Sequence, residues 1–207
     1  MDLMQPVQTV IPGVQGRILG VLAQTSAELN LRTIARLSGV SIAQASRVLP
    51  NLVGLGMVER REVPPSSLFR LREEHVASRA VLELAGARQT VLEQLGRTAG
   101  ALAPPPASLI VFGSLARGEA RADSDIDVIV VRPAEVAEED EAWASGIEEW
   151  RRHARRLTGN AVEIIEVGEH EIAPLLESRD PLWMEVVREG LVIFGRSLRE
   201  LAGRRSA

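Results

Sequence analysis

Two aspartates one residue apart lie in the segment GSLARGEARADSDIDVIVV, residues 113–131, just before an apolar run. Residues i and i+2 of a β-strand point to the same face, so Asp125 and Asp127 would share one surface. Ionisation of two close carboxylates is unfavourable unless a cation lies between them, and oxygen ligands favour Mg²⁺ or Mn²⁺. The pattern predicts a two-ion site suited to phosphoryl or nucleotidyl transfer.

Gly113 and Ser114 predict a phosphate-binding turn ahead of the aspartates. Glycine lets the backbone approach a ligand closely, and the serine hydroxyl with neighbouring amides can hydrogen-bond to phosphate oxygens where a helix begins. Arg117 has two open roles, which are contact with phosphate or an ion pair with Asp123 or Glu119 that holds the turn.

Two other motifs are excluded. Residues 113–118 have the glycine spacing of a Walker loop, but Glu119 and Ala120 stand where lysine and serine or threonine are required. The aspartates also imitate the start of a calcium-binding EF-hand, yet Val128 occupies the glycine position and Ala134 the closing glutamate.

The elements that position these residues follow an α/β pattern with a buried central sheet. We expect strands at 108–113, 125–131, 161–167 and 191–194, with helices at 135–157 and 169–188 and a terminal helix.

Gly113-Ser114, ten further residues and then Asp125-Ile126-Asp127 resemble the motif of the DNA polymerase beta-like nucleotidyltransferase superfamily, especially its minimal members. The resemblance covers roughly residues 86–200. It implies a mixed α+β sheet with flanking helices, two divalent ions, and transfer of a nucleoside monophosphate from a nucleoside triphosphate. Asp125 and Asp127 would be catalytic metal ligands, and Gly113, Ser114 and Arg117 would bind the nucleotide.

The family usually adds a third acid from a later strand, and here Glu163 and Glu166 are the candidates. They are three residues apart and therefore face opposite sides of a strand. We favour Glu163, which lies near the start of the strand, as metal ligand and general base.

The N-terminal segment resembles a winged helix-turn-helix domain over roughly residues 10–75. A helix at 31–37 ends at Gly39, and Ser41 can cap a second helix. We expect Pro50 to bend this second helix or to separate its last turn. Two strand-like runs on either side of Pro64 and Pro65 predict the wing. The residues expected to contact DNA are Ser41, Gln44, Ser46, Arg47, Arg60 and Arg61.

We expect three parts along the chain. Residues 1–75 form the winged helix-turn-helix domain, 76–106 one long amphipathic helix with a Pro linker, and 107–207 the nucleotidyltransferase domain. A winged domain followed by such a helix favours a homodimer.

Composition narrows the chemistry. The chain of 207 residues has no cysteine, which excludes disulfides and thiolate zinc sites, and its 24 basic residues are all arginine. With no apolar run long enough for a membrane span and no signal peptide, we expect no membrane partner and a cytoplasmic protein. The net charge of −4 argues against bulk attraction to nucleic acid.

Two functional hypotheses remain. In the first, the protein is a Mg²⁺-dependent nucleotidyltransferase with an unknown protein, RNA or small-molecule acceptor, directed by its winged domain; related minimal enzymes include partners in toxin-antitoxin pairs. In the second, it is a DNA-binding transcription regulator whose second domain senses ATP or another nucleotide without efficient turnover. The run RRHARR at 151–156 is either a solvated helix face or a grip on RNA or phosphate.

Overall fold

The computed structural model describes residues 1–203, which divide into two compact units. The N-terminal unit contains Asp2 and residues 4–87, and the C-terminal unit contains Met1, Leu3 and the chain from Arg88 onward. The mixture of helices and sheets agrees with the expected fold class, and the domain boundaries drawn from the sequence stay a prediction. Within the described residues, no helix combines the length and apolar character that a membrane crossing requires.

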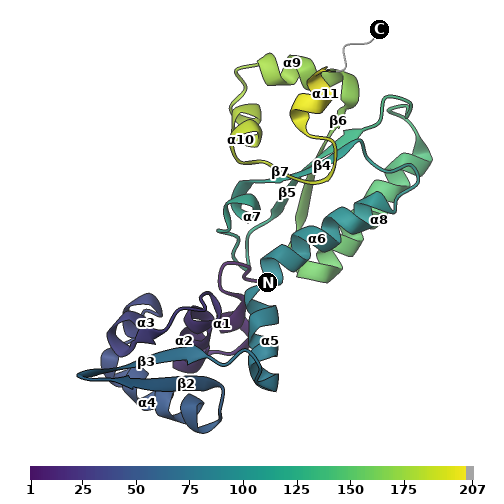
Figure 1. Cartoon of the computed structure of the whole chain (residues 1–207). Helices are drawn as coiled ribbons and strands as arrows, with labels where there is room; N and C mark the ends of the chain where they lie inside the picture. Colours follow the sequence, from purple (N-terminus) through teal and green to yellow (C-terminus); the bar gives the residue numbers. More distant parts are fainter. Residues whose placement is uncertain (204–207) are drawn as a thin grey trace. The chain divides into compact units, whose positions relative to one another are not determined.

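The N-terminal unit combines helices with a small antiparallel sheet of strand order β1-β3-β2 (Figure 1). Helices α3 and α4 form the expected helix-turn-helix, and β2 and β3 form the wing. Its elements are α1 (Pro6–Val10), α2 (Gly13–Ala23), β1 (Leu29–Asn30), α3 (Leu31–Leu37), α4 (Ile42–Gly54), β2 (Val58–Val63), β3 (Ser66–Leu71) and α5 (Val76–Ala85).

Helix α4 runs without interruption through Pro50, so its last turn is not a separate helix. Proline removes one backbone donor and crowds the preceding turn. The helix is anchored on both sides of the proline, because Leu49 and Leu52 are almost fully buried in the core of the unit. Burial of these apolar side chains offsets the missing hydrogen bond.

The expected long helix over 76–102 is instead two helices, α5 and α6 (Ala87–Gly100), separated at Gly86. Gly86 has ψ of 3°, outside the helical range, and its N–H donates to the carbonyl of Leu82 at 2.9 Å. Apolar periodicity continues across the break, which is why the sequence pattern alone predicts one helix.

The C-terminal unit is built on a four-stranded mixed sheet of order β6-β5-β4-β7. Strands β5 and β6 are parallel, and the other pairs are antiparallel. The elements after α6 are β4 (Ser108–Phe112), α7 (Gly113–Arg117), β5 (Ile126–Arg132), α8 (Glu141–Thr158), β6 (Val162–Gly168), η1 (Glu169–Glu171), α9 (Ile172–Glu177), α10 (Pro181–Glu189), β7 (Leu191–Gly195) and α11 (Leu198–Gly203).

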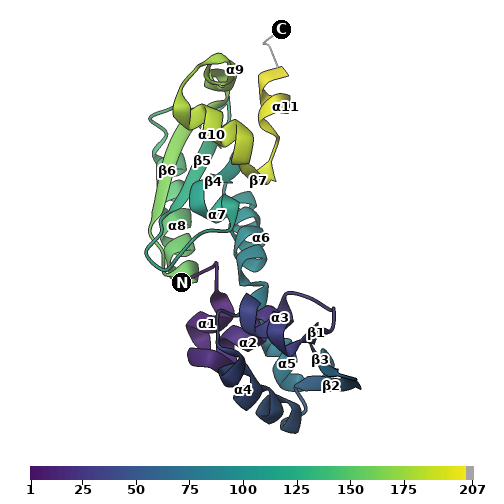
Figure 2. The same ribbon diagram turned by 90° about the vertical axis from the view of Figure 1, so that its left-hand side faces the viewer.

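Helices cover both faces of this sheet (Figure 2). Helices α6 and α8 lie side by side on one face, where the indole N–H of Trp150 donates to the carbonyl of Leu95 at 3.1 Å. The other face packs on α9, α10 and α11 through a cluster that includes Ile129, Ile172 and Val186. Asp127, two residues before Ile129 on β5, lies on this second face.

Candidate active site

The turn from β4 into α7 requires glycine at position 113. Gly113 has φ of +64°, a conformation that side chains disfavour. A Cβ built there would lie 2.4 Å from Oδ2 of Asp127, which is closer than atoms can approach without a shift. Ser114 follows as the second residue of α7. The predicted phosphate turn therefore lies directly against the carboxylate of Asp127.

Arg88, which lies outside the segment 113–127, hydrogen-bonds to the short helix α7. Its Nε donates to the carbonyl of Leu115 at 2.8 Å, and its Nη2 donates to the carbonyl of Ala116 at 2.6 Å. These carbonyls lie near the end of the helix, where backbone carbonyls lack the full set of intrahelical donors, and the Leu115 carbonyl also accepts from the N–H of Gly118 at 3.2 Å. Sequence reasoning missed Arg88, which belongs to α6 and lies 27 residues before Leu115.

Strand register brings Asp127 and Glu163 side by side. Asp127 is the register partner of Phe112 on β4 and of Glu163 on β6, so Glu163 shares its face of the sheet. Glu166 lies on the opposite face, where Nε of Arg132 donates to its carboxylate at 2.9 Å. Of the two candidate third acids, Glu163 is the one beside Asp127, and its catalytic role stays a prediction.

Burial raises the pKa of the Asp127 carboxyl above its ordinary value, and the negative charges of Asp125, Glu185 and Glu163 raise it further. The positive charge of Arg117 acts in the opposite direction. Within the described chain, no side chain or backbone amide donates a hydrogen bond to the carboxylates of Asp125, Asp127 or Glu163. Asp127 is therefore a half-buried acid whose charge is opposed by its neighbours.

These carboxylates do not form a ready-made metal cage. Across residues 1–203, no three His, Cys, Asp or Glu side chains converge closely enough to hold an ion. Asp125 and Glu163 are both exposed, whereas Asp127 is half-buried. The acids influence Asp127 as nearby charges, and the Mg²⁺ site stays a prediction.

Arg117 pairs with three carboxylates. Its Nε donates to Glu119 at 2.9 Å, and its Nη1 donates to Glu185 and Glu189, each at 2.7 Å. Of the two roles left open by the sequence, the structure has the ion-paired one, with Glu119 and not Asp123 as the neighbour. The acids of α10 were missed, because they follow Arg117 by about seventy residues and carry no local motif.

The uncharged polar residues expected to contact DNA make hydrogen bonds within the helix-turn-helix. Ser41 Oγ accepts from the Gln44 amide at 3.1 Å, and Gln44 Oε1 accepts from the Ser41 amide at 2.9 Å. This reciprocal pair is a capping box that begins α4. The Ser46 hydroxyl donates to the carbonyl of Ala43 at 3.0 Å. Their contact with DNA stays a prediction.

The expected DNA-binding arginines have different surroundings. Arg61 pairs with Glu28, an interaction that lowers the pKa of the glutamate, and Arg60 pairs with Glu62 at 2.6 Å. Arg47 is exposed on α4 and has no ion-pair partner among residues 1–203. A groove of about 1190 Å³ between α4 and the wing is lined by Ser46, Arg60 and a residue missed from the sequence, Arg32.

Two family models match the chain. Residues 92–177 match the model described as "Nucleotidyltransferase domain", and residues 16–62 match the "IclR helix-turn-helix domain". Both resemblances stated from the sequence are thereby confirmed. The first match contains the glycine turn, both aspartates and Glu163.

No curated protein matches the chain. A solved structure described as "Crystal structure of the toxin-antitoxin with AMP-PNP" is 19% identical and covers 55% of this chain and 80% of its own. The TM-score of this match is 0.37.

Proposed function

Since this chain carries a nucleotidyltransferase domain at residues 92–177 and an IclR-type helix-turn-helix domain at residues 16–62, we propose that it transfers a nucleoside monophosphate from a nucleoside triphosphate to an acceptor. The acceptor is a hydroxyl group on a protein, an RNA or a small molecule. The helix-turn-helix domain directs the enzyme to DNA. The observation that carries the proposal is the meeting of the Gly113 turn, Asp127 and Glu163 on one face of the sheet.

The acids fit a divalent cation by their chemistry. The raised pKa of Asp127 reflects burial and three neighbouring negative charges, and the attraction of a cation to the ionised carboxylate would offset both penalties. Asp125, Asp127 and Glu163 would hold Mg²⁺, or Mn²⁺ in its place, once their carboxylates move closer together than in the observed arrangement. When bound, the metal ions neutralise phosphate charge and steady the attacking and leaving oxygens.

The side chains have separate roles in the transfer. The Ser114 hydroxyl and the amides of the turn hydrogen-bond to the triphosphate. Glu163 accepts the proton of the acceptor hydroxyl while the hydroxyl oxygen bonds to the α-phosphorus. The bond between the α-phosphorus and the bridging oxygen breaks, and pyrophosphate leaves with that electron pair. Arg117 exchanges a glutamate partner for a phosphate oxygen when nucleotide binds.

Label transfer tests this proposal. The protein is incubated with α-labelled nucleoside triphosphates, Mg²⁺ and cell extract, and label on macromolecules and pyrophosphate release are measured. We expect Asp125→Ala and Asp127→Ala to abolish both. Asp123→Ala is the matched control, because Asp123 is an exposed acid of the same segment with no ion pair among the described residues. Full activity of Asp127→Ala contradicts the assignment.

A second function, nucleotide sensing by a DNA-binding regulator, is favoured by the Arg117 network. Three glutamates occupy this guanidinium group, and the described acids do not form a complete metal cluster. In that case the wild type binds a DNA operator and nucleotide but releases no pyrophosphate. Pyrophosphate release separates the two functions, because both predict DNA binding that Arg47→Ala weakens in a shift assay at several salt concentrations.

A further inference from the structure

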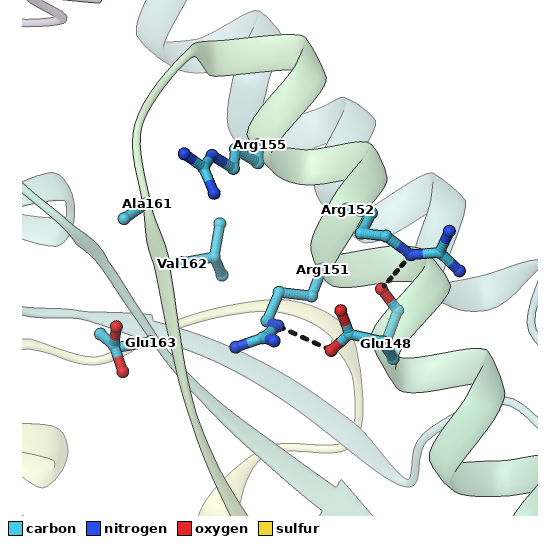
Figure 3. Close-up of a pocket in the computed structure, with 7 residues that line it drawn as sticks. All are labelled: Glu148, Arg151, Arg152, Arg155, Ala161, Val162 and Glu163. Carbon is cyan, nitrogen blue, oxygen red and sulfur yellow. Dashed lines mark hydrogen bonds and ion pairs between the residues drawn. The ribbon is translucent and has the colours of Figure 1, made fainter.

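An arginine-rich groove lies between α8 and the start of β6, outside the site described above. Its volume is about 180 Å³, and Arg151, Arg155, Ala161 and Val162 are among the residues that line it (Figure 3). We name it the α8 groove. Strand β6 is an edge strand, so the groove opens along the border of the sheet. It reaches Glu163, the register partner of Asp127.

The groove carries local positive charge on a protein of negative net charge. Its lining contains three arginines and two glutamates, Glu148 and Glu163, so the lining has a net charge of +1. Arg151 and Arg155 are four residues apart, so they lie on one face of α8 about 6 Å apart along its axis. Figure 3 shows both guanidinium groups extending toward β6. This spacing is comparable to that of neighbouring phosphates along a single nucleic-acid strand.

The arginines of the groove are available to a ligand. The guanidinium group of Arg155 has no ion-pair or hydrogen-bond partner among residues 1–203, and the residue is exposed. Arg151 pairs with Glu148 at 2.8 Å, but both side chains are about half exposed, at 48% and 47%. Exposed pairs of this kind contribute little to stability and exchange readily. A phosphate group can therefore replace the carboxylate of Glu148.

The sheet order distinguishes the two possible sources of phosphate. The triphosphate is assigned to the turn after β4, whereas the groove lies at β6, two strands away and on the side of the sheet that faces α8. In an in-line displacement, the attacking and leaving oxygens lie on opposite sides of the phosphorus. If pyrophosphate leaves on the α7 side, the acceptor enters from the β6 side. The groove is therefore on the acceptor side.

We propose that the α8 groove binds the phosphate backbone of a single-stranded polynucleotide whose terminal hydroxyl is the acceptor. This inference rests on the proposed transferase function. Arg151 and Arg155 hold phosphates upstream of the terminal nucleotide, and the strand crosses the edge of β6 to bring its end to Glu163. Figure 3 agrees with this path, because the Glu163 side chain points away from α8. A single strand fits better than a duplex, because the groove has a volume of only about 180 Å³.

The test measures binding of a fluorescent oligonucleotide of about 12 nucleotides to the full-length protein at several salt concentrations. The variant is Arg151→Gln with Arg155→Gln. The matched control is Arg97→Gln with Arg199→Gln, which removes the same charge from exposed positions of the same unit. Each phosphate contact contributes about 0.7 to the salt slope for a single strand, so the variant should lose about 1.4. Between about 50 mM and about 200 mM salt, the wild type should then lose affinity about sevenfold more than the variant.

Four results overturn the inference. An equal loss of oligonucleotide affinity in the control pair indicates attraction to bulk charge. A loss of affinity in Arg47→Gln alone assigns binding to the helix-turn-helix. Tighter competition by tripolyphosphate than by unlabelled oligonucleotide assigns the arginines to the incoming nucleotide. Equal binding of polyglutamate of the same charge shows unselective anion attraction. Melting temperatures of the variants are compared in parallel, because Arg155 also interacts favourably with the C-terminal end of the helix.

Failure of this inference is distinguishable from failure of the proposed function. If Asp127→Ala loses transfer but the arginine variant binds the oligonucleotide as the wild type does, the role of the α8 groove is refuted and the transferase function stands. Arginine-dependent binding without any transfer by the wild type refutes the transferase, and with it the acceptor role of the bound strand.

Discussion

Replacing Gly113 by alanine separates backbone strain from disturbance of the acid beside it. The left-handed conformation costs an alanine about 1–2 kcal/mol. For a unit of this size, that corresponds to a fall in melting temperature of about 4–8 °C. The new Cβ also lies 2.4 Å from Oδ2 of Asp127, so the carboxylate must move away from the turn. We therefore expect Gly113→Ala to lose stability and nearly all nucleotidyl transfer.

Gly118→Ala is the matched control for this prediction. Gly118 has a similar φ of +75° in the same unit, but the nearest atom to its added Cβ is Nε of Arg88 at 3.8 Å, an ordinary contact. We expect Gly118→Ala to lose about 1–2 kcal/mol of stability as well, but not to lose nucleotidyl transfer to a comparable extent. Urea unfolding and transfer rates are measured for both variants. Equal activities of the two would refute the role assigned to the contact between Gly113 and Asp127.

Two further predictions concern stability. Asp127→Asn should be more stable than the wild type at pH 7, because the raised pKa of Asp127 means that the native state favours its protonated form. Wild-type stability should fall as the pH rises from the pKa of Asp127 in the unfolded chain to its raised pKa in the native protein. Equal stability of the two proteins across a pH series of urea unfolding contradicts this prediction. Pro50→Ala should stabilise the N-terminal unit by up to about 3 kcal/mol, since α4 is helical through this position and the new N–H can donate to the carbonyl of Ser46; an unchanged urea midpoint counts against it.

Local patterns made much of the fold predictable. Ser41 and Gln44 have the spacing of a capping box, and the structure contains that box at the start of α4. The alternation of acids and apolar residues around Asp127 predicts a strand, and β5 begins at Ile126. Asp125 lies just before it. Such features depend on neighbours only a few residues apart, which a single sequence displays.

Features that depend on distant segments could not be predicted. Arg88 on α6 contacts the backbone of α7, and Glu185 on α10 pairs with Arg117 of α7. Neither residue belongs to a sequence motif. The sequence offered Glu163 and Glu166 as candidates on opposite faces. Only the parallel register of β5 and β6 shows that Glu163 is beside Asp127. The break at Gly86 was missed, because apolar periodicity does not report ψ angles.

The expectations of a homodimer and of a cytoplasmic location stay predictions. Light scattering of the full-length protein measures the first, and fractionation of cells measures the second.

Paired substitutions on β6 test whether the face of the sheet that carries Asp127 is the catalytic one. Mg²⁺-dependent pyrophosphate release is compared for the wild type, Glu163→Gln and Glu166→Gln, which remove a carboxylate from opposite faces of one strand. We expect Glu163→Gln to lower the rate about 10²- to 10⁴-fold, because it removes the general base. Glu166→Gln should transfer at nearly the wild-type rate. Wild-type activity of Glu163→Gln would contradict the account.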